Sequence, residues 1–280
     1  MNEFKGYHPL VNFIYFLFVI TLSAYFMHPV FVVINFISSV LYVYPYKKSK
    51  LFFVIPLVVI LSVIYPLHNH QGITILAYFP DGNPLTVESV LYGFIRAIAI
   101  LNIICWSVSF FRVITTDKLL YLLSTLSPSL ALVFSMILRF VPRFLAQLKK
   151  VVVAQRGMGR DIHSGSIAKR VKLVMSVFSI MITWSVENSI EIADSMKARG
   201  YGTGRRTWFS IYTFCKRDLT LLSVILVLGL SILLIPKPYY SYYPSLHFSV
   251  SNPYFFAVCF LLCMVPEIIK IYEHRKLSGV

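Results

Sequence analysis

Acidic residues are scarce in this chain of 280 residues, which has 11 Asp and Glu against 26 Lys and Arg and a formal net charge of +15. All charged residues together make up 13% of the sequence, whereas hydrophobic residues make up 58%. The mean hydropathy is +0.74. Because an ordinary soluble domain is about 25% charged, this composition excludes that class and indicates a membrane protein.

Cysteine is also sparse, with four residues that form no CxxC pair and no metal-ligand spacing. Cys259 and Cys263 are four residues apart and share one helix face, where buried packing is the simplest role. The sequence also lacks a P-loop. It therefore predicts no redox chemistry, no cofactor, no metal site and no nucleotide hydrolysis within this chain.

Continuous apolar runs are abundant and approach the roughly 20 helical residues that cross a bilayer. Continuous runs are unlike the alternating strands of a membrane barrel, so strands are unexpected and an all-α membrane fold is predicted. We expect six transmembrane helices, near residues 10–27, 29–44, 51–67, 88–111, 219–235 and 254–272.

The loops between these spans differ in their basic residues. Lys47, Lys48 and Lys50 lie between the second and third spans, whereas 68–87 has no Lys or Arg and 236–253 has only Lys237. Basic loops stay on the cytoplasmic side of a membrane. The lysine-rich loop and both chain termini are therefore expected to face the cytoplasm.

One segment does not fit the pattern of spans. From 139 to 217 the chain has 15 Lys and Arg but four acids, a net charge of +11, yet 173–186 is nearly all apolar. So many charges are costly in lipid, and helices lying at the inner surface of the membrane reconcile both facts. We expect four N-terminal spans in 1–114, a cytoplasmic platform in 115–217 and two C-terminal spans in 218–280.

Two platform helices are predicted to end in short arginine-containing strings. Apolar pieces broken at Pro128 run to Pro142, a helix follows near 143–156, and a long helix covers roughly 167–199. Glycines follow both helices, and Gly200 stands where a helix C′ glycine belongs. Arg156 and Arg199 are therefore expected at the C-terminal tips of the two helices.

The end of the helix at which these strings lie decides which functions they can have. Phosphate-binding loops use a helix N-terminus after a strand, whereas these glycines follow helix C-termini, which favour cations. Arg199 offers five donors in a rigid fork, and the small Ala198 and Gly200 beside it let a partner approach closely. Two roles stay open from physics alone, docking of a partner and simple complementation of the helix dipole.

Three acids, Glu187, Glu191 and Asp194, fall on one face of the second long helix. The simplest role is charge balance in the basic platform, with Arg156 or Arg160 as partners. They could instead be acid/base groups of a membrane-embedded enzyme acting on an anionic lipid or polyprenyl phosphate, but no histidine or metal-ligand pattern accompanies them. A third interpretation is an insertase-like scaffold with Arg96 in a polar groove.

One run at the end of the second long helix extends from Glu187-Asn188-Ser189-Ile190-Glu191 through Ala193-Asp194-Ser195-Met196-Lys197-Ala198-Arg199-Gly200-Tyr201-Gly202, with Arg206-Thr207 following. This run resembles the transmembrane T component of energy-coupling factor transporters, the vitamin- and metal-importing ABC systems of prokaryotes. Weaker matches extend the resemblance over most of the chain up to residue 207: His8-Pro9-Leu10, His28-Pro29, Asn83-Pro84, Arg139-Phe140-Val141-Pro142 and Ala154-Gln155.

The resemblance implies a non-enzymatic coupling subunit in a prokaryotic cell membrane. Its partners would be two ABC ATPase subunits, identical or different, and a membrane S component that binds the substrate; nucleic acid is not among them. Ala198-Arg199-Gly200 would be the second of two ATPase-docking motifs. The first departs from the family pattern, because Met158 stands where its arginine belongs; Gln155-Arg156-Gly157 in a shifted register, or Arg160, would take its place.

Overall fold

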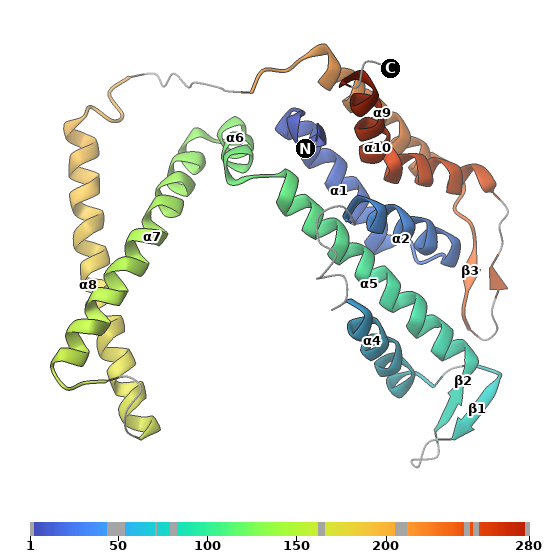
Figure 1. Cartoon of the computed structure of the whole chain (residues 1–280), viewed down its shortest axis with the longest axis horizontal. Helices are drawn as coiled ribbons and strands as arrows, with labels where there is room; N and C mark the ends of the chain where they lie inside the picture. Colours follow the sequence, from blue (N-terminus) through green and yellow to red (C-terminus); the bar gives the residue numbers. More distant parts are fainter. Residues whose placement is uncertain are drawn as a thin grey trace. The chain divides into compact units, whose positions relative to one another are not determined.

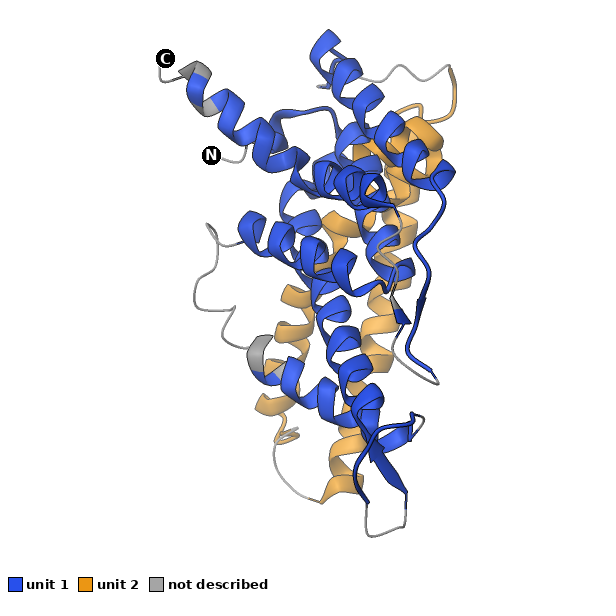
Figure 2. Cartoon of the chain, turned by 90° about the vertical axis from the view of Figure 1, so that its right-hand side faces the viewer, with its two compact units in different colours: residues 1–119, 212–280 blue, residues 120–211 orange. Residues whose placement is uncertain are grey.

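The computed structural model describes residues 3–43, 54–70, 72–78, 83–161, 166–204, 212–243, 247–248 and 252–277. The chain forms two compact units, one of residues 1–119 with 212–280 and one of residues 120–211 (Figure 2). Lys47, Lys48 and Lys50 of the lysine-rich loop, and Arg206-Thr207, lie outside the described residues.

The larger unit is built from helices that correspond to the six predicted spans, which confirms the all-α membrane fold. Its elements are η1 (Glu3–Gly6), α1 (Pro9–Tyr25), α2 (Pro29–Val43), α4 (Val54–His68), β1 (Ile75–Tyr78), β2 (Pro84–Thr86), α5 (Val87–Val113), α9 (Lys216–Leu234), β3 (Tyr240–Ser241), β4 (His247–Phe248) and α10 (Pro253–Leu277). A short helix, α6 (Thr116–Leu126), follows α5 and contains the boundary with the second unit (Figure 1).

The prediction that strands are absent is wrong in the two loops expected on the outer side. Strands β1 and β2 form one antiparallel hairpin, and β3 and β4 form another. The periodicity of the long apolar runs is uninformative here, because strands of two to four residues lie between the spans. Thr86 at the end of β2 then starts α5 by accepting a hydrogen bond from the Ser89 N–H at 3.3 Å.

Helix α5 organises the larger unit, because it packs against α1, α2 and α4 (Figure 1). Gly93 lets α4 approach closely: a Cβ atom at this position would lie 2.9 Å from the Ser62 carbonyl oxygen. Trp106 is fully buried and donates its indole N–H to Asn35 Oδ1 at 2.8 Å. Such close contacts and buried polar ties are what hold apolar helices together when their surroundings are equally apolar.

Five helices among the described residues are long and apolar enough to cross a membrane, and they are α5, α7 (Pro128–Gly157), α8 (Ile167–Ala198), α9 and residues Pro253–Glu273 of α10. Helices α1, α2 and residues Val58–His68 of α4 are apolar but shorter. The set of apolar helices thus includes the two long helices of the second unit.

The second unit consists mainly of α7 and α8. Helix α7 is continuous from Pro128 to Gly157, so the prediction of a separate helix beginning near 143 is wrong. Pro142 lies inside α7, where it removes one backbone donor and crowds the carbonyl one turn earlier. Long apolar helices tolerate such a proline where neighbouring groups satisfy the freed carbonyl. The predicted break at Pro128 and the predicted helix over 167–199 are confirmed to within a residue.

Helices α7 and α8 pack against each other through a narrow seam. The ring of Phe140 stacks on Trp184 with a centroid distance of 5.7 Å and an interplanar angle of 24°, and Phe144 lies 6.2 Å from the same indole. On α8 the buried residues Leu173, Val177 and Met181 follow one stripe. Many apolar side chains on the other faces of both helices remain exposed, so lipid or a partner must cover them.

Candidate functional site

The C-terminus of α8 ends in a defined capping motif. The helix closes at Ala198, Arg199 is the C-cap, and Gly200 adopts φ +74°. The Tyr201 N–H donates to the Met196 carbonyl at 3.1 Å, and the Gly200 N–H donates to the Lys197 carbonyl at 2.9 Å. These two bonds define a Schellman motif, which requires the left-handed conformation that glycine adopts without strain. The predicted position of Gly200 at C′ is confirmed.

The C-terminus of α7 ends in the same motif. Gly159 has φ +73° and donates its N–H to the Arg156 carbonyl at 3.0 Å. The Arg160 N–H donates to the Gln155 carbonyl, also at 3.0 Å. Matching the two motifs bond for bond pairs Met158 with Arg199. It also pairs Arg156 with Lys197. The backbone therefore supports the alignment in which Met158 stands at the position of the docking arginine.

The side chains of the first tip are held differently from the side chain of Arg199. Arg156 Nε lies 3.4 Å from Asp161 Oδ2, and the side chain of Arg156 is 62% exposed. An ion pair this exposed contributes little stability, about 0–1 kcal/mol. Gln155 is buried, and its amide oxygen has no hydrogen-bond partner among the described residues. Arg156 and Met158 are therefore the side chains that the first tip presents, together with Arg160.

The expected pairing of Glu187, Glu191 or Asp194 with Arg156 or Arg160 does not occur among the described residues. Helices α7 and α8 run in opposite directions, so the two C-terminal tips lie at opposite ends of the helix pair (Figure 1). The three acids belong to the C-terminal part of α8, far along the pair from the end of α7. Asp161, which follows α7 directly, pairs with Arg156 instead.

A cleft of about 430 Å³ lies between α7 and α8 on the side of their crossing that leads to Arg199. Arg139 and Arg143, one turn apart on α7, line it together with Arg199, Glu191 and Asn188 of α8. Neither Glu187 nor Asp194 is among its lining residues. Of the three acids, only Glu191 therefore lines the cleft that Arg199 also lines.

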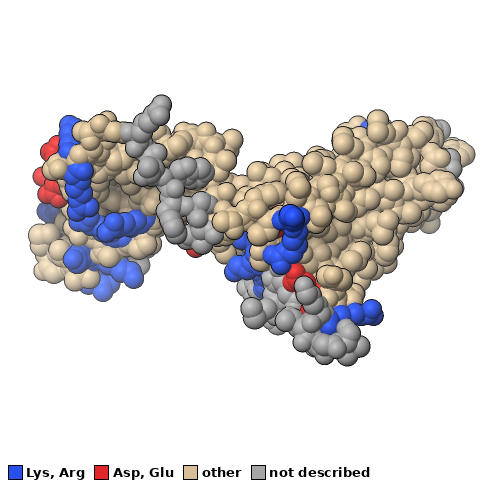
Figure 3. All heavy atoms as spheres, turned by 90° about the horizontal axis from the view of Figure 1, so that it is seen from above, with Lys and Arg blue, Asp and Glu red and all other residues tan. Residues whose placement is uncertain are grey.

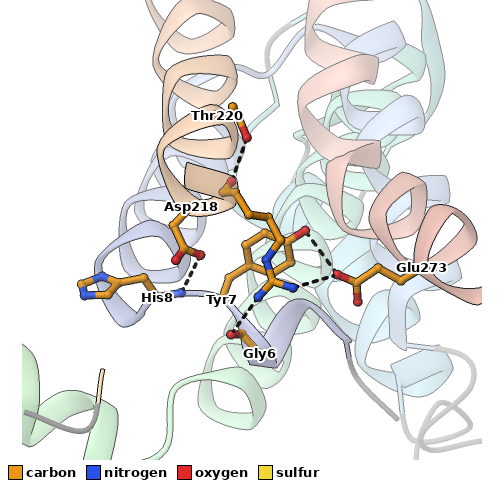
Figure 4. Close-up of polar contacts among 7 residues, drawn as sticks. Gly6, Tyr7, His8, Asp218, Thr220 and Glu273 are labelled. Atoms are coloured by element: carbon orange, nitrogen blue, oxygen red, sulfur yellow. Dashed lines mark hydrogen bonds and ion pairs between the residues drawn. The ribbon is translucent and has the colours of Figure 1, made fainter. Parts of the chain in front are cut away.

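A second polar cluster lies in the larger unit, around the N-terminal residues Gly6, Tyr7 and His8 (Figure 4). Asp218, in the first turn of α9, accepts from the His8 N–H at 3.2 Å and from the Cys215 N–H at 3.0 Å. Arg217 lies 3.4 Å from Glu273 of α10 and 4.3 Å above the Tyr7 ring. The start of α9 is therefore tied to the N-terminal segment.

Lys118 ties the start of α6 to the same segment. Its Nζ donates to the Lys5 carbonyl at 2.6 Å and to the Tyr7 carbonyl at 3.3 Å. With the Asn12 amide turned so that both of its groups are satisfied, the Asn12 oxygen is a third acceptor at 2.8 Å. Burial lowers the pKa of Lys118 from 10.5 to about 8. The chain leaves the larger unit after residue 119 and re-enters it at 212, so both connections are fastened to Lys5–His8.

Several of these residues escaped prediction from the sequence. Arg139 and Arg143 were visible as basic residues four apart on a helix, but only the packing of α8 shows that they share a cleft with Arg199. Asp218 had a local signal, since it closes a capping box with Cys215 at the start of α9. Lys118 had none, because its acceptors are backbone carbonyls more than 100 residues away in sequence.

Comparison with known proteins assigns a family to this architecture. The model of the CbiQ family, described as cobalt transport protein, matches residues 5–208. The energy-coupling factor transporter transmembrane protein EcfT of Lactobacillus helveticus is 33% identical over 153 residues, 51% of this chain and 55% of that protein. EcfT 1 of Listeria monocytogenes is 30% identical over 192 residues, 62% of this chain and 70% of that protein.

A third relative, from Bifidobacterium longum, is named as an ABC transporter ATP-binding protein. It is 29% identical over 99 residues, which are 35% of this chain and 13% of that protein. The matched region spans about half the length of the Lactobacillus protein and a small part of the Bifidobacterium protein. The family match itself covers well over half of this chain. The chain therefore belongs to the CbiQ family of transporter membrane components, which are not enzymes.

Proposed function

We propose that this chain is the coupling subunit of an energy-coupling factor importer for a vitamin or a metal ion. In this role it passes the ATP-driven motion of two ABC ATPase subunits to a membrane S component that holds the substrate. The platform that contains α7 and α8 faces the cytoplasm, as do both chain termini. The proposal extends the family assignment to the partners, and the exposed arginine at the end of α8 is the observation that supports it most directly.

Arg199 suits docking because no described residue engages its guanidinium. It is exposed, and no ion pair or side-chain hydrogen bond joins it to any described residue. The Schellman motif fixes the backbone on both sides, so little order has to be gained on binding. Ala198 and Gly200 carry almost no side chain, which leaves the guanidinium fork accessible to a carboxylate or to carbonyl oxygens of a partner groove.

The Bifidobacterium relative supports an ATPase as this partner. A segment similar to about a third of this chain occurs there within a protein named for ATP binding. When a membrane segment and an ATP-binding protein are joined in one polypeptide in one organism, the corresponding separate chains of another organism are expected to bind each other. This chain has no P-loop of its own, so an ATP-driven importer needs its hydrolysis from such a partner.

The first tip docks, in our proposal, through Gln155-Arg156-Gly157 in a register shifted relative to α8. Arg156 is the cation nearest to the end of α7, and its contact with Asp161 is long and exposed, so it can be exchanged for a partner at little cost. Gln155 supports the tip from its buried side. Met158, at the position equivalent to Arg199, provides an apolar contact beside the cation.

Substitution of Arg199 tests the docking role. We expect Arg199→Ala to abolish uptake and to weaken recovery of the ATPase subunits by roughly 30-fold, because a central arginine contact is worth about 2 kcal/mol or more. Helix content and membrane insertion should stay unchanged. Lys197→Ala is the matched control, since Lys197 is an exposed cation two residues earlier in the same turn. Normal uptake by a correctly inserted Arg199→Ala protein would remove Arg199 from the interface.

A further inference from the structure

We propose that the cleft between α7 and α8 binds the headgroup of an anionic glycerophospholipid, with the phosphate held by Arg139 and Arg143 of α7. This site is distinct from the docking role of the tip, because most of its lining lies along the two helices and not at their ends. Arg139 and Arg143 have no part in docking, and Arg199 lines the end of the cleft without holding the phosphate.

The charge of the cleft calls for an anion. Three guanidinium groups line it against one carboxylate, that of Glu191. Among the described residues, no ion pair or side-chain hydrogen bond engages Arg139, Arg143 or Arg199. Figure 3 shows Lys and Arg side chains around a hollow on the left of that view, over the unit that contains α7 and α8. Arginine binds phosphate oxygens in a bidentate manner, so a phosphate matches this set of donors.

Asn188 provides an independent indication of a ligand. It lines the cleft, is only 4% exposed, and its amide nitrogen has no hydrogen-bond partner among the residues that the structure describes. Buried polar groups are nearly always hydrogen-bonded, because an unpaired buried donor destabilises the fold. A phosphate or ester oxygen seated in the cleft accepts this missing hydrogen bond.

The position of the cleft along α7 identifies a membrane lipid as the source of the phosphate. Residues 128–138 carry no charge, and basic residues begin at Arg139 and continue through Arg143. A change from apolar to basic along one helix is typical of the level of the headgroups on the cytoplasmic side. The cleft lies at this change, and Met136, Phe140 and Met196 provide apolar lining next to the arginines.

The remaining polar side chains favour a headgroup with hydroxyl groups. Three guanidinium groups and the Glu191 carboxylate give the cleft a net charge of +2. The Glu191 carboxylate can accept hydrogen bonds from hydroxyl groups. Ser195, one turn further along α8, also lines the cleft. Phosphatidylglycerol offers one phosphate, two headgroup hydroxyls and acyl chains for the exposed apolar residues, including Leu138 and Val141 of α7. An acidic peptide would leave those apolar residues uncovered.

Lipid retention measured by native mass spectrometry tests the site on the full-length protein. The protein is released from nanodiscs that contain equal amounts of phosphatidylglycerol and phosphatidylcholine. We expect preferential retention of phosphatidylglycerol, and a loss of retention on the order of tenfold or more in Arg139→Gln/Arg143→Gln, because two charge-assisted contacts are removed. Lys149→Gln/Lys150→Gln removes the same charge from exposed positions of α7 outside the cleft and should retain the lipid.

Further arms separate the alternatives. Asn188→Leu keeps the charge and is expected to weaken retention, and circular dichroism checks that each variant is folded. If inorganic phosphate at millimolar concentration displaces the lipid fully, the site recognises free phosphate and the lipid proposal is wrong. Equal retention of both lipids, or equal loss in the two double variants, would also overturn it. All of these variants keep Arg199, so failure of the lipid site leaves the docking proposal untouched, and failure of docking leaves this one untouched.

Discussion

Arg199 and Met158 occupy the same position of the same capping motif, yet one is a cation and the other a thioether. The backbone at both helix ends depends on a glycine in the left-handed region, and the side chain before it is free to vary. Specific chemistry at a tip therefore resides in one or two side chains, on a backbone that the glycine fixes.

The first prediction at this scale concerns the capping glycine of α7. Gly159→Ala should destabilise the protein by about 1 kcal/mol, because φ +73° is strained for any residue with a Cβ. No atom lies within 4 Å of the added Cβ, so the cost is one of backbone conformation. Gly157→Ala, inside the last turn of α7, should instead stabilise by about 0.5–1 kcal/mol. Thermal unfolding in detergent measures both; a loss at Gly157→Ala equal to that at Gly159→Ala would contradict the assignment.

The register of the first tip is a second prediction. Of Arg156→Ala, Met158→Ala and Arg160→Ala, we expect Arg156→Ala to reduce ATPase recovery most. A partner groove that binds a cation should bind the one nearest the end of the helix, which is Arg156. The measurement is co-purification from membranes at fixed expression. If the loss is confined to Met158→Ala, the tip docks in the same register as Arg199; if it is confined to Arg160→Ala, the docking residue lies beyond the helix.

Lys118 makes a pH-dependent contribution to stability. Its pKa in the folded protein, about 8, lies below the ordinary value of 10.5, so between these values the unfolded chain binds the proton and the folded chain does not. Stability therefore rises as the pH increases from about 8 to 10.5. Below pH 8 Lys118 is protonated in both the folded and the unfolded chain, so it adds no pH dependence there. Unfolding temperatures of the wild type and Lys118→Met across this range should diverge in favour of the wild type. An exposed lysine variant, Lys149→Met, should follow the wild type at every pH.

Among elements, the N-terminal segment Lys5–His8 is the common anchor of the two connections to the α7–α8 unit. Lys118 fastens α6 to it, and Asp218 fastens α9. In the function that we propose, motion of the α7–α8 unit can act on the larger unit through these connections. The fastening therefore belongs to the coupling path that we propose, although no residue in it resembles a docking motif.

Asp218→Asn tests this fastening. The carboxylate accepts two backbone N–H groups, from His8 and Cys215, and the amide can accept only one of them with its single oxygen. We expect a loss of about 1–3 kcal/mol in stability, and in reconstituted complexes more ATP hydrolysed per substrate transported. Asp117→Asn, at an exposed acid in the first turn of α6, is the control. Unchanged coupling in a folded Asp218→Asn complex would confine the residue to a structural role.

The helices were predictable from the sequence wherever apolar length or capping residues defined them. Gly200, the break at Pro128 and the apolar runs of α5, α9 and α10 are local signals, and each has its counterpart in the structure. Pro142 misled because its effect depends on whether the flanking turns persist, which a single residue does not decide. The α7–α8 cleft and the contacts of Lys118 join residues distant in sequence, so no local pattern could reveal them.

For the whole molecule, the C-terminal tips of α7 and α8 lie at opposite ends of the helix pair (Figure 1), an arrangement that is compatible with the two ATPase subunits that we propose as partners. The chain belongs to a family of transporter membrane components, and in our proposal it supplies neither the hydrolysis nor the substrate site. In that proposal it functions only within an assembly. The exposed apolar faces of α7 and α8 agree with this, since lipid or partner chains have to cover them.

The stoichiometry of the complex purified from native membranes tests this account most directly. Native mass spectrometry of the affinity-tagged chain should show one copy bound to two ATPase subunits and one small membrane S component, and Arg199→Ala should release the ATPases. Recovery of the wild-type chain alone or as a homo-oligomer, with turnover of a lipid or polyprenyl phosphate, would contradict it and favour a membrane-embedded enzyme.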